Sequence, residues 1–192
     1  MEQIQQNQPQ PWVRYFARAF DITLFSIVVY FIIRLFYHGQ IIYSRAYIYI
    51  PITFIWVYVE GLIISRYGTT LGKWLLNTKI TTSVGGKPDL TTATNRSLLV
   101  WLKGLGLGLP LVTIITKLYQ LNRISKITKA SWDQKLNLEV VHSKISKARA
   151  WLFVFLFIFV NDIVNYLTLL NYKVTFTNLI FSFFKFQISK FF

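Results

Sequence analysis

Residues 12–37 form a long apolar run that opens with two arginines and contains one acid. At about 100° per residue, a helix would place Arg14, Arg18 and Asp21 within about 60° of one another. Both guanidinium groups could then reach the carboxylate. The remaining faces of this helix carry aliphatic and aromatic side chains, which suit lipid or neighbouring helices. The sequence therefore predicts a membrane helix with a built-in ion pair.

The composition also indicates a membrane protein. The chain has 192 residues, 54% of them hydrophobic, whereas a soluble domain has about 45–50% apolar residues. A net charge of +14 is typical of nucleic-acid-binding proteins, but the basic residues here flank long apolar runs. We therefore expect the lipid bilayer and its anionic head groups as partners, and no nucleic acid.

Two further runs are long enough to cross a bilayer, whose core is about 30 Å thick. Residues 46–65 are mostly apolar and contain Pro51 and Glu60, and residues 151–170 are also mostly apolar. The Phe-rich tail, residues 174–192, suits either a final span or an amphipathic interfacial helix, of which we favour the span.

A short connection makes the first two helices antiparallel neighbours. The start of one then lies level with the end of the other, so Asp21 and Glu60 should lie at similar depth. Arg14, Arg18 and Arg66 gather at the same side. The excess of basic residues there places this cluster and the N-terminus on the cytoplasmic side.

Residues between the apolar runs predict short elements. The spacing of apolar residues in 71–75 indicates an interfacial helix, and 78–84 resembles a strand that ends in a Gly-Gly turn. A helix should begin near Asn95. Residues 135–141 alternate like a second strand, which could pair with the first.

Residues 97–119 are apolar but interrupted, and each side of the break has only about ten residues, too few to cross alone. Basic segments flank the stretch on both sides. A plain span would move the larger basic segment across the membrane, so we favour a re-entrant hairpin and keep a kinked full span as the alternative. The interrupting residues are Lys103, Gly104, Gly106, Gly108 and Pro110.

Three motifs resemble the RDD family of bacterial membrane proteins, which is named for an Arg and two Asp residues. Arg14 and Asp21 in RYFARAFD match the first two positions, and Asp133 in SWDQKLNLEVV matches the third. The tract at residues 68–80 is similar to the family's Gly-x-Thr-Leu-Gly-Lys signature. The resemblance covers about residues 12–142 and implies a multi-pass inner-membrane protein with a transport role. The signature residues here are Gly68, Thr70, Gly72 and Lys73.

These observations predict an all-α integral membrane protein. It would be a multi-pass helical bundle with a small cytoplasmic β-like element and a Gly/Pro-broken re-entrant segment, in the bacterial inner membrane. Residues 1–11 would form a disordered tail, 12–142 an RDD-like membrane module, and 143–192 a C-terminal membrane extension.

Acidic residues within the spans are the candidate sites, because a carboxylate in a span is costly and marks ion pathways. Asp21 and Glu60 are candidates for a proton or small-cation site, with a structural ion pair to Arg14 and Arg18 as the alternative. Asp162 could line a polar path or make interhelical hydrogen bonds.

The sequence excludes several classes of function. It has no cysteine and two isolated histidines, so we expect no transition-metal site. Residues 68–73 lack the spacing of a phosphate loop. No set of nucleophile, base and orienting residue can be assembled, so we expect no cofactor and no enzymatic activity.

Two functions therefore remain open. One is transport of a proton, cation or small solute, and the other is a non-enzymatic membrane scaffold or assembly factor. The chain is small for a transporter built from repeats, and assembly into a homo-oligomer would compensate for its size.

Overall fold

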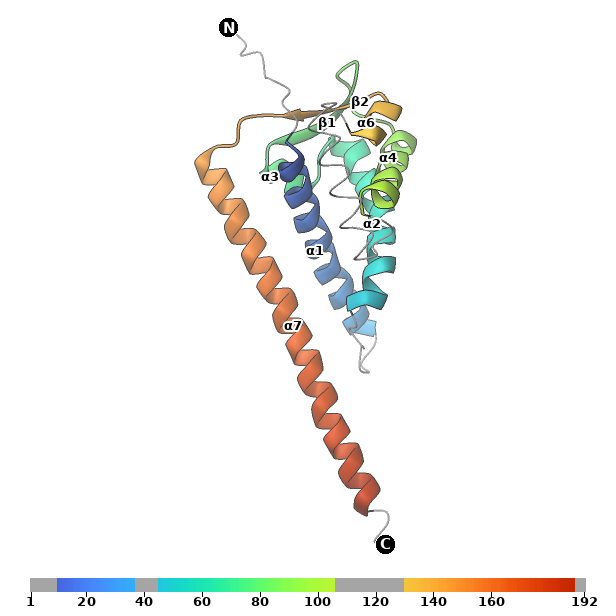
Figure 1. The fold of residues 1–192 in the computed structure, drawn as a ribbon, viewed down its shortest axis with the longest axis vertical. Coiled ribbons are helices and arrows are strands. Elements are labelled where there is room, and N and C mark those ends of the chain that lie inside the picture. Colours follow the sequence, from blue (N-terminus) through green and yellow to red (C-terminus); the bar gives the residue numbers. More distant parts are fainter. Residues whose placement is uncertain (1–9, 37–44, 106–129, 189–192) are drawn as a thin grey trace.

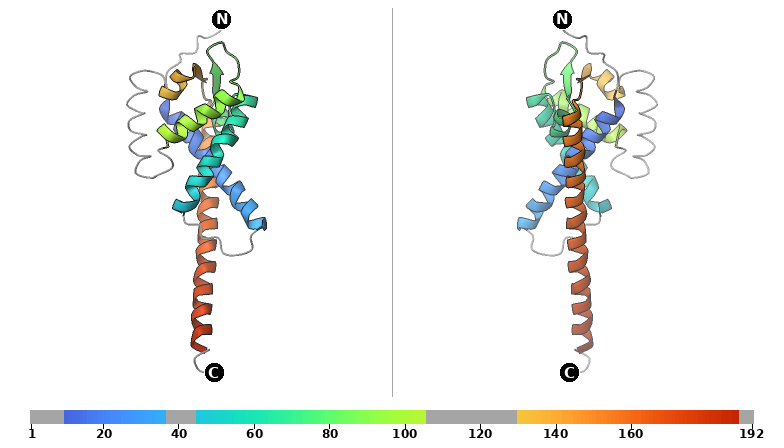
Figure 2. Two further views of the ribbon diagram at one scale, coloured as in Figure 1. Left: turned by 90° about the vertical axis from the view of Figure 1, so that its right-hand side faces the viewer. Right: turned by 90° about the vertical axis from the view of Figure 1, so that its left-hand side faces the viewer.

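The computed structural model describes residues 10–36, 45–105 and 130–188. Helices α1 (Pro11–Phe36) and α2 (Arg45–Tyr67) run antiparallel and cross each other (Figures 1 and 2). The rings of Phe25 and Trp56 pack with centroids 5.2 Å apart at this crossing. Most of the predicted N-terminal tail and of the Gly/Pro break lies outside the described residues, and Pro11 at the end of that tail already begins α1.

Helix α7 (Lys147–Ile188) runs alongside α1 and then extends beyond the ends of both α1 and α2 (Figure 1). Phe153 and Val160 are buried in the cluster of apolar side chains between α7 and α1, and the rings of Phe20 and Phe153 lie 5.6 Å apart. The helix has no break near residue 170. The prediction that residues 174–192 form a separate final span is therefore wrong for this structure, because residues 174–188 continue α7.

Three of the described helical segments are long and apolar enough to cross a membrane. They are α1, residues 50–67 of α2 and residues 147–167 of α7. Each coincides with an apolar run in the sequence. At about 1.5 Å per residue, the 42 residues of α7 extend roughly twice the thickness of a bilayer core.

A two-stranded antiparallel sheet lies at the end of the molecule where α1 begins (Figure 1). Strands β1 (Thr78–Thr82) and β2 (Leu138–His142) pair with Thr78 opposite His142. Strand β1 lies within the predicted strand at residues 78–84, and β2 overlaps the predicted strand at residues 135–141. The bounds of β1 are shorter than expected, and β2 begins three residues later.

Each strand follows a five-residue helix through the same type of turn. Helix α3 (Leu71–Leu75) leads into β1, and α6 (Ser131–Lys135) leads into β2. The residue before each strand is an asparagine with positive φ, 53° at Asn77 and 50° at Asn137. Asparagine adopts this left-handed conformation more readily than most residues, which explains its place in both turns.

Helix α4 (Leu90–Lys103) packs against α2 and begins five residues earlier than predicted. The carboxylate of Asp89 accepts a hydrogen bond from the Thr92 backbone N–H at 3.2 Å, which caps the helix. Gly61 of α2 lies directly against Thr94, where any larger residue would collide. Helix α4 therefore holds Arg96 of its buried face near Glu60 of α2.

Candidate functional site

Glu60 of α2 is the centre of a buried ion-pair network. Its two oxygens lie 2.7 and 2.9 Å from Arg18 Nη2, and Oε1 also accepts a hydrogen bond from Lys73 Nζ at 2.5 Å. The Glu60 side chain is 2% exposed. Two cations therefore share one carboxylate away from water, an arrangement in which removal of any partner is costly.

Asp21 of α1 is bound differently. Its Oδ2 accepts a hydrogen bond from the Thr70 hydroxyl at 2.5 Å, and its Oδ1 accepts one from the Gly72 backbone N–H at 2.6 Å. Within the described residues no basic side chain forms a salt bridge with it. Asp21 is thus a buried carboxylate held by neutral donors.

A chain of hydrogen bonds connects the two acids. Lys73 Nζ donates to Glu60 and also lies 3.3 Å from Thr70 Oγ1, whose hydroxyl donates to Asp21. Helix α3 supplies both connecting side chains. Burial lowers the pKa of Lys73 against the opposing effect of the Glu60 charge. The site therefore contains an ammonium group for which proton release is easier than usual.

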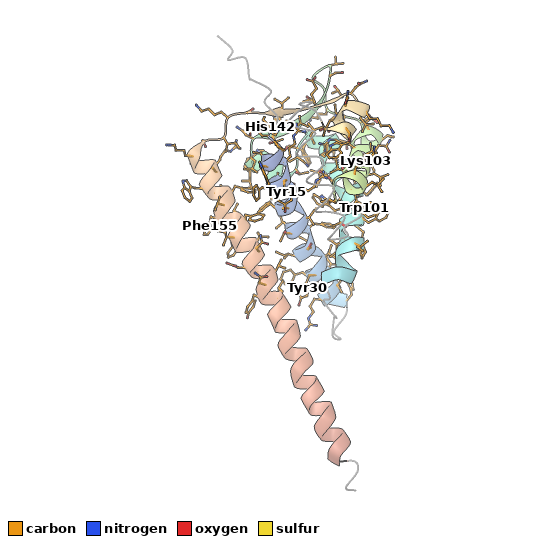
Figure 3. All side chains as sticks on the ribbon, viewed as in Figure 1. Tyr15, Tyr30, Trp101, Lys103, His142 and Phe155 are labelled. Atoms are coloured by element: carbon orange, nitrogen blue, oxygen red, sulfur yellow. The ribbon has the colours of Figure 1, made fainter. Side chains whose placement is uncertain are left out.

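Asp133 of α6 forms the second half of the network. Its two oxygens separately pair with Arg14 Nη1 at 3.1 Å and Arg96 Nε at 2.7 Å. Arg14 Nε also donates a hydrogen bond to His142 Nε2 at 3.2 Å. Figure 3 shows His142 at the end of the molecule where α1 begins. The sheet therefore contributes directly to the site.

The contacts of His142 fix its tautomer. Because Nε2 accepts from Arg14, the ring proton lies on Nδ1, 3.1 Å from Thr78 Oγ1. The Thr78 hydroxyl in turn donates to the Leu76 carbonyl at 3.1 Å. Burial and the nearby Arg14 charge lower the pKa of His142 to about 4. The imidazole is therefore neutral at pH 7.

We expect acid to destabilise the protein through His142. The unfolded chain takes up the proton near pH 6.5 and the folded protein only near pH 4, so the free energy of unfolding should decrease as the pH falls from 6.5 to 4. The loss should be at most about 3 kcal/mol. Thermal unfolding in detergent across this range would measure it. In His142→Gln the decrease should be smaller, and an equal decrease would contradict this assignment.

Each of the family-signature residues in the tract at residues 68–73 makes a specific contact or adopts a specific conformation. Gly68 has φ +72°, and its carbonyl accepts a hydrogen bond from the Ile80 N–H at 2.8 Å. Thr70 binds Asp21, and Lys73 binds Glu60. Gly72 brings α3 against the α1 backbone, where a Cβ atom would lie 3.0 Å from Asp21 Oδ1. This motif joins α3 to both spans.

The structure brings together most of the predicted site residues, but with different partners. Asp21 and Glu60 belong to one hydrogen-bonded network, as their similar depth suggested. The predicted ion pair within α1 is wrong, because Arg14 pairs with Asp133 and Arg18 with Glu60. Helical spacing would allow both guanidinium groups to reach Asp21. Each of them instead pairs with a carboxylate on a neighbouring element.

Asp162 lies outside this network. Its side chain is exposed on α7, and within the described residues no salt bridge joins it to a basic residue of the network. Asn161 donates to the Phe157 carbonyl of its own helix at 2.7 Å. The polar path around Asp162 stays a prediction.

Sequence reasoning missed three members of the network. Arg96, His142 and Thr78 come from α4 and the two strands, and each has polar partners on a different element. The burial of Arg96 could have been predicted, because it lies at helical spacing from Ala93 and Val100 on one face of α4. The described residues contain no group of acids or histidines that could hold a metal ion.

Comparison with known proteins identifies the family. The model of the RDD family matches residues 8–186. The chain belongs to the RDD family. Searches of curated proteins and of solved structures gave no significant match. The match continues beyond residue 142, where the recognised motifs end, and it covers most of α7. It is an RDD-family membrane protein with apolar helices.

Proposed function

We propose that this RDD protein transports a proton or a small cation across the membrane, with Asp21 as the carboxylate that binds it. The proposal rests on the environment of Asp21. This carboxylate is buried on a candidate span, and among the described residues it accepts hydrogen bonds only from the Thr70 hydroxyl and the Gly72 N–H. Glu60, by contrast, is neutralised by two cations. A carboxylate without an ion pair can exchange a proton or cation at lower cost.

The hydrogen-bonded chain through α3 provides a route for a proton. Lys73 and Thr70 connect Glu60 to Asp21, and the lowered pKa of Lys73 makes it a suitable intermediate donor. We place the network near the cytoplasmic side of a bacterial inner membrane, with α1, α2 and α7 as spans. The basic segments around the sheet support this orientation.

Asp21→Asn is the most informative test. The asparagine carbonyl can still accept from the Gly72 N–H, and its NH2 group can donate to the Thr70 hydroxyl, so the fold should persist. We expect proton or sodium flux in proteoliposomes to fall at least about tenfold, as for loss of an acid–base group. Size-exclusion chromatography and thermal unfolding would establish that the variant is folded.

Asp162→Asn is the matched control, because it makes the same change at an exposed acid outside the network. Its flux should stay close to that of the wild type. Full flux in folded Asp21→Asn would contradict the proposal. Glu60→Gln is a poorer test, since it leaves Arg18 and Lys73 without their carboxylate and should reduce the yield of folded protein.

A non-enzymatic membrane scaffold is the alternative, and the surface of α7 supports it. Trp151 is 74% exposed and Phe155 is 66% exposed, although both belong to a helix that packs on α1 through other residues. Figure 3 shows Phe155 on the length of α7 beside α1. Purification with a stoichiometric partner from native membranes would favour this function, and recovery of the protein alone would count against it.

A further inference from the structure

The buried network has more positive than negative groups. Two carboxylates, Glu60 and Asp133, form salt bridges with four cations, and Asp21 adds a third acid nearby. Arg96 joins the two halves, because its charge acts on Arg14 as well as on Glu60 and Lys73. With Lys73 protonated and Asp21 ionised, the network holds one uncompensated positive charge. Its cations are Arg14, Arg18, Lys73 and Arg96.

The chain has few acids left to balance this charge. It contains seven in all, of which three belong to the network. Asp89 caps α4 at the surface, Glu139 lies on β2 opposite Thr81, and Asp162 is exposed on α7. The seventh is Glu2, outside the described residues. A buried charge is retained only when it is paired, so a counter-charge from outside the chain is the simplest remedy.

One guanidinium nitrogen indicates where such a counter-charge would bind. Arg96 is 4% exposed, and its Nε pairs with Asp133, yet its Nη1 is buried with no hydrogen-bond partner in the described structure. Among the described residues, the hydroxyl of the adjacent Ser97 also has no hydrogen-bond partner, and it is buried. Buried donors of this kind are rare, and they indicate a bound water or ion.

We propose that this network binds one small monovalent anion, such as chloride, at Arg96 Nη1. A single negative charge neutralises the network, and the unpartnered N–H groups supply the hydrogen bonds that a halide accepts. The proposal goes beyond transport through Asp21 and does not depend on it. Anion binding can be measured on purified protein in which no flux takes place.

Protonation of Lys73 and binding of the anion should favour each other, because each is balanced by the other's charge. The groups facing Lys73 are Arg18 and Asp21 from α1, Glu60 from α2 and Arg96 from α4. Two of these are cations and two are acids. When Lys73 is neutral, the positive and negative charges of the network are equal without an anion. When Lys73 is protonated, the network needs one further negative charge.

Thermal unfolding in detergent tests the proposal, with sodium chloride replaced stepwise by sodium gluconate at constant ionic strength. We expect chloride to raise the Tm of the full-length protein saturably, by about 3–6 °C at ten times the dissociation constant. Lys73→Gln removes the uncompensated charge and should abolish this rise. Lys79→Gln removes a charge from an exposed lysine on β1 and should retain it.

Arg96→Lys locates the site. The shorter ammonium group can keep the pair with Asp133 but cannot also present a second planar donor, so the rise in Tm should be lost or strongly reduced. Equal Tm values for the wild type in chloride and gluconate would overturn the proposal. A chloride-dependent rise that persists in Lys73→Gln, or that disappears equally in Lys79→Gln, would also overturn it.

Discussion

Replacement of Asp133 by alanine is expected to prevent accumulation of folded protein. Asp133 is 2% exposed and binds Arg14 and Arg96 through separate oxygens, so the variant would leave the buried Arg96 and the half-buried Arg14 without a carboxylate. Loss of one partner of a buried ion pair destabilises a protein by about 3–5 kcal/mol, against a total stability of about 5–15 kcal/mol. The amount of monodisperse protein extracted in detergent, followed by its thermal unfolding, would measure the effect.

Asp89→Ala is the matched control for this prediction. Asp89 is an acid at the surface whose hydrogen bond caps α4, and loss of such a cap reduces stability by about 0.5–2 kcal/mol. The Asp89 variant should therefore be extracted at nearly normal levels. Equal stability of the two variants would show that Asp133 acts only as a local helix residue.

The role of Asp133 was only partly accessible from sequence. The family resemblance marked the position, and the sequence by itself allows pairing with Lys129 or Lys135 as well as a cluster with the Arg14 region. The actual pairs join residues 119 and 37 positions apart in the chain. Helical periodicity predicts the side of a helix on which a residue lies, whereas partners on other elements depend on how those elements pack.

The same limit explains the other error in the site. Arg18 and Asp21 share a face of α1, which made an ion pair within the helix reasonable. In the folded protein Arg18 pairs with Glu60, which lies 42 residues further along the chain. Asp21 instead accepts a hydrogen bond from the α3 backbone. Local spacing shows that two groups can meet, but not whether a better partner is available.

The elements themselves were more predictable. Long apolar runs identified α1 and α2, because burial in lipid requires apolar length. The Gly-Gly turn indicated the first strand, and alternation indicated the second. The length of α7 was not predicted. Residues 151–170 and 174–192 were predicted as separate elements, yet one helix continues through residues 171–173, since none of these is a proline.

Gly72→Ala is expected to separate α3 from α1. A Cβ atom at Gly72 would lie 3.0 Å from the Ala17 carbonyl carbon and from Asp21 Oδ1, and closer still to the Ala17 carbonyl oxygen. The Ala17 atoms belong to a helix backbone and cannot rotate away. Overpacking of this kind costs about 1–3 kcal/mol, and loss of the Gly72 hydrogen bond to Asp21 adds about 1.5–3 kcal/mol. Thermal unfolding in detergent should show this loss as a lower Tm.

Gly86→Ala provides the comparison, because its added Cβ would meet only the Thr82 hydroxyl, at an ordinary 3.5 Å. Its Tm should differ little from that of the wild type. If Gly72→Ala remains folded, Asp21 loses its backbone donor while keeping its charge, so flux should fall together with stability. Wild-type flux and Tm in that variant would mean that α3 can leave α1 without consequence, and the motif at residues 68–73 would then not be what positions Asp21.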